Sequence, residues 1–373
     1  MKKTITSWMF IGLLAFLTAC GGSATTDAEA EAEAEEAQEE LEDTLGEEAE
    51  NAIPDTASDV VTTLADVNGF TIVTELFNPH SYDIYGTEVK ITAFVKDHSN
   101  NPVSDGTVVS FVADDNGLIE DQCITSGGVC FVTWTSARDS SQPVSPPASH
   151  DPGYVDDFKV TIMARTIGED SFIDKNSNSL YDPGETWFTQ SEAFIDTDDN
   201  GSYDSDVNNF DEYFDFNKDG VYNDGLSNTL FRGDSCSTTA IAAGHCKARL
   251  EVWNTVTMIN SDGNSVNVIL RDCNGNTLSN VDLTINTCFT IELQDVNGNV
   301  PPIGTKLSVT TDVGDIKTAP PSTVPNVYIQ PGSGLVQGMI IAPQATDQDD
   351  GVLTITVESV TGLILGYPYL ISD

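Results

Sequence analysis

One short pattern occurs three times in succession and limits how the middle of this chain can fold. The copies are FIDKNSNSLYD from Phe172, FIDTDDNGSYD from Phe194 and YFDFNKDGVYN from Tyr213. Counted from the Asp in third place, each copy has an oxygen-bearing side chain at positions 1, 3, 5 and 9, Gly or Ser at 6 and Tyr at 8. A hard cation takes six to eight oxygen ligands at about 2.3–2.6 Å, and this alternation directs them toward one point. The pattern therefore predicts calcium-binding loops.

The loops differ in how complete they are. Only the first has a carboxylate at position 12, Glu185, whereas the other two have Val207 and Leu226 there. Loops two and three must therefore borrow a last ligand, for which the candidates are Asp206, Asp211, Glu212 and Asp224. The predicted ligands are Asp174, Asn176, Asn178, Leu180 (through its carbonyl), Asp182 and Glu185 in the first loop, Asp196, Asp198, Asn200, Ser202 and Asp204 in the second, and Asp215, Asn217, Asp219, Val221 and Asn223 in the third.

A solvated acidic loop with chance Asx turns is the alternative to a calcium site. Chance would not keep Tyr181, Tyr203 and Tyr222 at the same position of every copy. Magnesium is a weaker alternative, because it requires six oxygens at a tighter distance and retains its waters. We therefore expect two to three calcium ions. Because copies two and three need outside ligands, we also expect the segment to fold as one unit.

The negative charge of the chain is unevenly distributed. The net charge is −44, and residues 27–50 carry 13 Asp or Glu and no Lys or Arg. Residues 167–232 carry 16 acidic residues against Lys175, Lys218 and Arg232. Such a field repels nucleic acid and attracts divalent cations, so a nucleic-acid partner is excluded.

The N-terminus has the features of an export signal. Lys2 and Lys3 precede an apolar run from Trp8 to Leu17, which is too short to span a membrane. Leu17-Thr18-Ala19-Cys20 resembles the bacterial lipobox, which implies cleavage after residue 19 and lipidation of Cys20. In that family Gly21, in place of Asp, favours the outer membrane. Residues 20–59 then form an acidic, low-complexity linker with little to bury.

Six cysteines remain after Cys20, and an even number in an exported protein indicates disulfides. Six thiols allow fifteen pairings, of which pairing between sequence neighbours is the simplest. A zinc site is the alternative, but no Cys-x-x-Cys pair occurs and His is scarce. The neighbour pairs are Cys123 with Cys130, Cys236 with Cys246 and Cys273 with Cys288.

From Val60 onward the chain consists of short β-branched and aromatic runs separated by Asn, Gly, Asp and Pro, which predicts strands. Within Glu88–Lys96 the residues Val89, Ile91, Ala93 and Val95 alternate with polar ones and mark one buried face. Regularly spaced strands of this kind indicate a β-sandwich. The other predicted strands are 71–77, 107–113, 129–136, 158–165, 249–259, 265–271, 289–294, 306–311, 335–341 and 352–360.

These residues resemble the invasin/intimin-type bacterial immunoglobulin-like domain. The resemblance lies in Val89-x-Ile91-x-Ala93-x-Val95-x-Asp97, Asn100-Asn101-Pro102-Val103, Gly106-Thr107-Val108-Val109-x-Phe111 and Thr135-Ser136. It covers residues 60–167 and implies an immunoglobulin-like sandwich there. Asp97, Asn101, Gly106, Thr107 and Ser110 recur 198 positions later as Asp295, Asn299, Gly304, Thr305 and Ser308, which predicts a second, divergent sandwich.

We therefore predict an all-β protein with two immunoglobulin-like sandwiches. The expected parts are a signal peptide (1–19), a lipidated linker (20–59), a first sandwich (60–167), a calcium-binding insertion (168–235) and a second sandwich (236–373). The loops resemble dockerin or thrombospondin-type calcium repeats more than a helix-flanked EF-hand.

No Gly-x-Ser-x-Gly, His-Glu-x-x-His or P-loop motif occurs, so the prediction is that the protein is not an enzyme. We expect a lipid-anchored protein of the outer membrane or cell surface that acts in adhesion, with an unknown protein or glycan as partner. In this interpretation calcium stiffens a joint between the two sandwiches. The alternative is a module that captures carbohydrate or another substrate in a calcium-dependent way.

Overall fold

The computed structural model describes residues 64–82, 84–113, 117–137, 158–196, 201–205, 211–225, 228–282, 287–342 and 350–372. The chain divides into two units, Met1–Val60 and Val61–Asp373, and all described residues belong to the second. The signal peptide, Cys20 and the acidic linker lie outside them, so those assignments remain predictions. No helix among the described residues is both long and apolar enough to cross a membrane.

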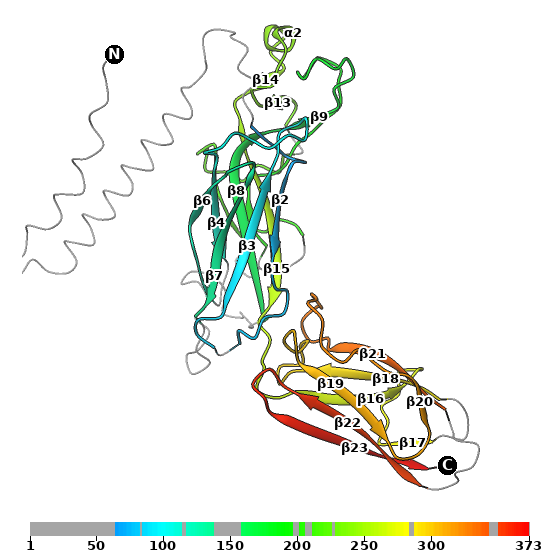
Figure 1. Ribbon diagram of the computed structural model, residues 1–373. Helices are drawn as coiled ribbons and strands as arrows, with labels where there is room; N and C mark the ends of the chain where they lie inside the picture. The colour runs from blue at the N-terminus through cyan, green and yellow to red at the C-terminus, as the bar shows by residue number, and fades with distance from the viewer. Residues whose placement is uncertain are drawn as a thin grey trace, which may run out of the picture. The chain divides into compact units, whose positions relative to one another are not determined.

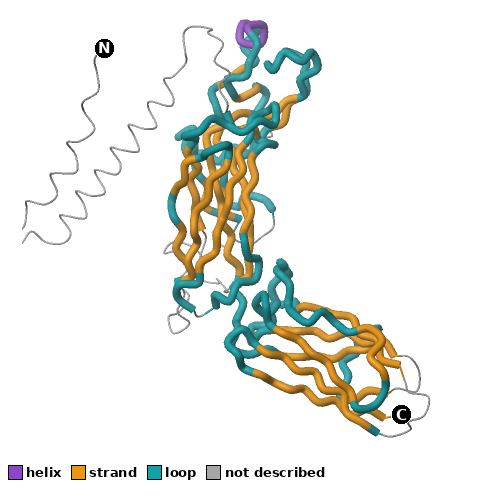
Figure 2. Tube along the Cα trace, in the orientation of Figure 1, coloured by secondary structure: helices purple, strands orange, loops and turns teal. Residues whose placement is uncertain are grey.

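The first sandwich consists of two sheets packed face to face (Figures 1 and 2). One sheet has the order β2 (Phe70–Thr74), β3 (Glu88–Val95), β7 (Val129–Ser136) and β5 (Gly117–Ile119). The other has the order β1 (Ala65–Asp66), β8 (Lys159–Glu169), β4 (Val108–Ala113) and β6 (Gln122–Ile124), and β15 (Leu250–Ile259) also pairs with β8.

The core of this sandwich follows the alternation read from the sequence. Along β3 the inward side chains of Val89, Ile91, Ala93 and Val95 are buried. They pack in one apolar cluster with Trp134, which is 0% exposed. Gly117 is required beside this ring, because a Cβ there would lie 2.4 Å from the indole. The predicted alternation along β3 is therefore confirmed.

The predicted domain boundary was wrong at β15. This strand pairs with β8 in an antiparallel register of ten residues, from Leu250 opposite Gly168 to Ile259 opposite Lys159. It was assigned to the second sandwich because it precedes that sandwich in the chain, but its hydrogen bonds are to the first. The second sandwich therefore begins after Ile259 rather than at residue 236.

This pairing also shows that the insertion lies elsewhere than the sequence suggested. Residues 170–249 connect β8 to β15, so they leave and re-enter the first sandwich at the Gly168–Leu250 end. Figure 1 shows a group of short elements beyond this end of β8, namely β9 (Ser171–Phe172), β13 (Phe231–Arg232), α2 (Thr238–Ala242) and β14 (Cys246–Lys247). The chain leaves for the second sandwich from the other end of β15, ten residues or about 33 Å away. The predicted calcium loops therefore do not lie between the two sandwiches, and the interpretation of the insertion as a joint between them was wrong.

The second sandwich also has two sheets. One has the order β16 (Asn267–Asp272), β18 (Thr287–Gln294), β21 (Leu335–Ala342) and β20 (Asp315–Thr318). The other has the order β17 (Asn280–Asp282), β23 (Ile364–Ser372), β22 (Gly351–Glu358) and β19 (Lys306–Thr311). Phe289, Ile291 and Ile355 are among its fully buried side chains. The prediction of an all-β chain with two immunoglobulin-like sandwiches is thus confirmed.

The turn that repeats at an offset of 198 has the same hydrogen bonds in both sandwiches. The Asn101 N–H donates to Asp97 Oδ1 over 2.8 Å, and the Asn299 N–H donates to Asp295 Oδ1 over 2.9 Å. In each turn the Asp N–H donates to the Asn carbonyl, and the Asn N–H donates to the Asp side chain instead of to the Asp carbonyl. Identical residues at equal spacing therefore mark equivalent turns.

Side-chain hydrogen bonds link the segment after β15 to both sandwiches. The Ser81 hydroxyl donates to Asn260 Oδ1 over 2.7 Å, and the Ser261 hydroxyl donates to the Val300 carbonyl over 2.8 Å. The buried Asn78 amide donates to the Pro301 carbonyl over 2.9 Å. The Ser261 and Asn78 side chains thus satisfy main-chain carbonyls that would otherwise be buried unpaired.

The three disulfides join the neighbouring cysteines, as predicted. They are Cys123–Cys130, Cys236–Cys246 and Cys273–Cys288, with Cα separations of 5.8, 6.6 and 5.6 Å. The second closes the tip of the insertion, where α2 (Thr238–Ala242) lies between the two cysteines.

Candidate calcium centre

Short strand pairs hold the three loops of the insertion. β9 (Ser171–Phe172) pairs with β10 (Trp187–Phe188) on either side of loop 1. β11 (Phe194–Ile195) pairs with β12 (Glu212–Tyr213). β11 ends directly before the first Asp of loop 2, and one residue, Phe214, separates β12 from the first Asp of loop 3. The repeated aromatic residue before each loop therefore belongs to a strand.

The first Asp of every loop closes the turn in the same way. One of its carboxylate oxygens accepts the N–H of position 6, and that residue has a left-handed φ, which Gly adopts without strain. The pairs are Ser179 to Asp174 (2.8 Å, φ +62°), Gly201 to Asp196 (2.7 Å, φ +78°) and Gly220 to Asp215 (2.7 Å, φ +74°).

A second carboxylate meets position 9 of every loop through a reciprocal pair of main-chain contacts. It accepts the position-9 N–H, and its own N–H donates to the position-9 carbonyl. In loop 1 this residue is Glu185, at 2.9 and 3.1 Å from Asp182. In loop 2 it is Asp211, at 2.8 and 2.9 Å from Asp204. In loop 3 it is Glu192, at 2.9 and 2.9 Å from Asn223.

These contacts identify candidates for the borrowed ligands. Asp211 was one of the four candidates from the sequence, and the structure brings it to loop 2. Glu192 was not among them, because it precedes its loop by a whole repeat and lies 31 residues from Asn223. No spacing rule within a loop points to it.

Side-chain amides and carboxylates converge inside loops 1 and 3. Asp182 Oδ2 accepts both the Asn176 and Asn178 amides, over 2.7 and 2.8 Å. The Asn223 amide nitrogen lies 3.2 Å from Asp219 Oδ2 and 2.8 Å from the Val221 carbonyl. Three of the predicted side-chain ligands of loop 1 therefore lie within hydrogen-bonding distance of one another, as do two of loop 3 together with the Val221 carbonyl.

Three of these carboxyl groups have pKa values below their usual range. Hydrogen bonding is the main cause: the Ser179 N–H for Asp174, the Ser237 side chain for Asp182 and the Val221 N–H for Asp219. Donors to a carboxylate favour its charged form. These three carboxyl groups of loops 1 and 3 therefore have lower pKa values than an ordinary Asp and stay charged to a lower pH.

The donor atoms of loops 1 and 3 are of the kinds that calcium binds, whereas loop 2 is described only in part. Asp198 and Asn200 of loop 2 lie outside the described residues. Within those that are described, no three His, Cys, Asp or Glu side chains form a group that could hold a metal. In loops 1 and 3 the carboxylates do not converge into such a group, and each donor set also includes Asn and main-chain oxygens, which calcium accepts.

Aromatic rings divide the insertion into two clusters. Tyr181 of loop 1 stacks on Phe231, with ring centroids 4.7 Å apart, in a cluster that includes Cys236. Tyr203 and Tyr222 of loops 2 and 3 stack at 3.9 Å, and Phe194 packs against both. The described residues therefore pack as two units, not as the single unit expected from the sequence.

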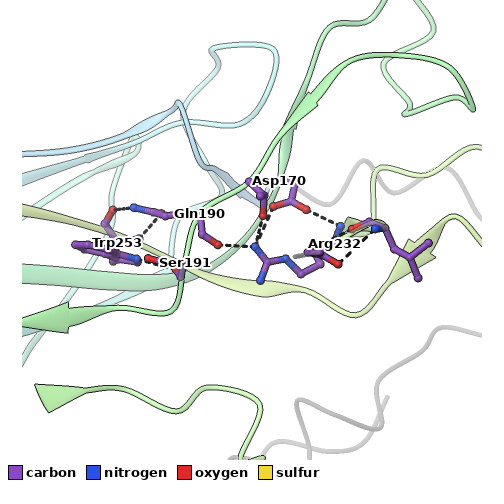
Figure 3. Close-up of polar contacts among 8 residues, drawn as sticks. Asp170, Gln190, Ser191, Arg232 and Trp253 are labelled. Carbon is purple, nitrogen blue, oxygen red and sulfur yellow. Dashed lines mark hydrogen bonds and ion pairs between the residues drawn. The ribbon is translucent and has the colours of Figure 1, made fainter. Parts of the chain in front are cut away.

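A polar network attaches the insertion to the first sandwich (Figure 3). Gln190 accepts the N–H of Trp253 over 3.2 Å and donates to its carbonyl over 2.8 Å, as a neighbouring strand would. The Trp253 indole donates to the Ser191 carbonyl over 3.0 Å. Arg232 donates to the Gln190 carbonyl over 2.7 Å and pairs with the buried Asp170 at 3.4 Å. Segment 189–192 therefore covers part of the edge of β15.

A cavity of about 410 Å³ lies beside loop 3. Its lining includes Glu192, Asn217 and Asn223 together with Lys247, and Phe216, which is 36% exposed. It combines acidic, basic and aromatic groups, which suits a polar ligand more than an apolar one.

No protein-family model matches the chain, and no curated protein matches it. Among solved structures it is similar to the D0-D1 domain of intimin (10% identity, TM-score 0.22, covering 81% of this chain and 98% of that one). It is also similar to the Yersinia pseudotuberculosis adhesin InvE (9% identity, TM-score 0.22, 85% and 62%) and to invasin, a bacterial integrin-binding protein (10% identity, TM-score 0.21, 80% and 39%). Similarity at this level does not establish a shared function, and the two-sandwich fold rests on the strand pairing above.

Proposed function

We propose that this chain is a non-catalytic, lipid-anchored surface protein whose first sandwich ends in a calcium-ordered insertion used for adhesion. The observation that carries the proposal is the geometry shared by all three loops. In each, one carboxylate binds the position-6 N–H and a second carboxylate forms the reciprocal contact with position 9. Three unrelated acidic turns would not share both contacts.

Calcium acts in this proposal by ordering one end of a sandwich. Without ions the 16 acidic residues within 167–232 repel one another, and bound calcium offsets that repulsion. The ordered loops then form a defined surface where immunoglobulin-like domains commonly bind partners, at the end of the sandwich.

Calcium titration of the purified protein tests this proposal. Calorimetry is expected to give two to three sites with dissociation constants of about 10⁻⁴–10⁻³ M, as in other extracellular modules. Calcium at 100 times the dissociation constant then stabilises the fold by about 2.7 kcal/mol per site. Magnesium at the same concentration serves as the control and should stabilise much less. The absence of both heat and thermal stabilisation would refute the proposal.

Calcium-dependent capture of a polar ligand, such as a saccharide, is a second candidate function. The cavity beside loop 3, with Phe216 and Lys247 in its lining, favours it. A glycan array probed with and without calcium distinguishes the two functions. Only ligand capture predicts calcium-dependent binding to saccharides of one class.

A further inference from the structure

Glu192 is buried in a way that loop 3 alone does not explain. Its side chain is 6% exposed, and Oε2 accepts the Asn223 N–H over 2.9 Å and the Asn223 amide over 3.3 Å. The other oxygen, Oε1, has no hydrogen-bond partner among the described residues. Burying a carboxylate oxygen without a partner is costly, so an unpaired Oε1 next to a loop indicates a missing positive partner.

Oxygens of loop 3 and of Glu192 surround the Asn223 amide nitrogen. The amide nitrogen of Asn223 lies within 3.5 Å of Asp219 Oδ1 and 3.2 Å of Oδ2, as well as 2.8 Å from the Val221 carbonyl and 3.3 Å from Glu192 Oε2. Four oxygens from three residues thus surround one weakly positive group. Calcium prefers such an arrangement of oxygens, with one carboxylate able to bind through both atoms.

We infer that Glu192 supplies the last carboxylate ligand of the calcium ion held by loop 3, so that this ion fastens segment 189–192 to the loop. The inference rests on the proposed calcium function and deepens it. Gln190 and Ser191 are already hydrogen-bonded to Trp253 of β15 at 2.8–3.2 Å. Filling loop 3 therefore also secures the insertion against the edge of the first sandwich.

A purely structural role for Glu192 makes a different prediction. If it served only to accept the Asn223 N–H, Glu192→Gln would retain an acceptor oxygen and calcium would not alter the effect of the substitution. If it is a ligand, the sign of the effect depends on calcium. In chelator the variant is at least as stable as the wild type, because the unpaired buried carboxylate is gone. In calcium the variant is less stable, because one ion is lost.

The experiment compares the full wild-type chain with Glu192→Gln and with a matched control, Glu88→Gln. Glu88 is an exposed glutamate of β3, outside the insertion, so its substitution removes the same charge without touching a loop. Calorimetry is expected to show one calcium site weakened on the order of 100-fold or more in Glu192→Gln only, since even outer-sphere partners are worth 10–100-fold. Thermal unfolding in chelator and in calcium shows whether the stability difference between Glu192→Gln and the wild type changes sign.

Hydrogen exchange locates the effect. In the wild type, calcium is expected to protect peptides that cover residues 189–195, 215–223 and 250–255. Glu192→Gln loses this protection but keeps that of loop 1, residues 174–185, whereas Glu88→Gln keeps both. A second variant, Glu192→Asp, retains the charge at a shorter reach and is expected to bind with intermediate affinity.

The two proposals fail in different ways. If calcium produces no heat and protects no peptide of the wild type, the calcium function itself is wrong. If calcium protects loop 1 and binds Glu192→Gln and Glu192→Asp as tightly as the wild type, the calcium function stands and the assignment of Glu192 is overturned.

Discussion

The buried carboxyl group of Glu169 makes the stability of the first sandwich depend on pH. Glu169 is 2% exposed, lies opposite Asp66 in the β1–β8 pairing, and accepts two hydrogen bonds from Ser235. Burial raises its pKa from 4.5 to about 7, with Asp66 and Asp234 adding to the rise and Ser235 opposing it. The folded protein therefore keeps a proton that the unfolded chain releases near its ordinary pKa.

The sign and size of the effect follow from this difference. Between pH 4.5 and 7 the folded state binds more protons than the unfolded state, so the free energy of unfolding falls as pH rises. A difference of 2.5 pKa units at 1.36 kcal/mol each corresponds to a loss of about 3 kcal/mol across that window. Glu169→Gln removes the proton exchange, and the variant should gain stability relative to the wild type as pH rises.

Urea unfolding in chelator at pH 5, 6, 7 and 8 measures this difference. Tryptophan fluorescence follows the relevant part of the chain, because Trp134, Trp187 and Trp253 all belong to the first sandwich or its insertion. Glu88→Gln, at an exposed position of β3, is the control and should run parallel to the wild type. Parallel stability curves for the wild type and Glu169→Gln would show that the reasoning is wrong.

Two further predictions concern the attachment and the tip of the insertion. Arg232→Met leaves the buried Asp170 without its ionic partner and should cost about 3–5 kcal/mol by chemical unfolding, while adding Asp170→Asn should recover most of the loss. If Asp170→Asn restores no stability to the Arg232→Met variant, the two side chains are not energetically coupled. Cys236→Ala with Cys246→Ala opens a loop with a sequence separation of 10 and should cost about 2–3 kcal/mol, visible as faster proteolysis within residues 237–245; unchanged cleavage would contradict it.

Features that depend on near neighbours in the chain could be read from the sequence. The alternation along β3 predicted its buried face because side chains of a strand point to opposite sides of the sheet. The disulfides joined the nearest cysteines, at separations of 7, 10 and 15 residues. The Asp-to-Asn turn was recognisable wherever it occurred, because its hydrogen bonds span only four residues.

Features that depend on distant residues could not be read in this way. The pairing of β15 with β8 includes an ion pair between Arg165 and Glu251, which are 86 residues apart and 3.1 Å from each other. Glu192 reaches Asn223 across 31 residues. Neither contact leaves a periodic pattern in the sequence, because the intervening chain can vary in length without changing the local signals.

The threefold pattern after Phe172 shows where this division lies. By itself the sequence determined the loops, since the first Asp, the left-handed residue and the position-9 residue all lie within nine positions of one another. Only the tertiary structure decided which carboxylate approaches loops 2 and 3, and at which end of the first sandwich the insertion lies. The physical reason is that local hydrogen bonds close a turn, whereas strand pairing determines which distant segments meet.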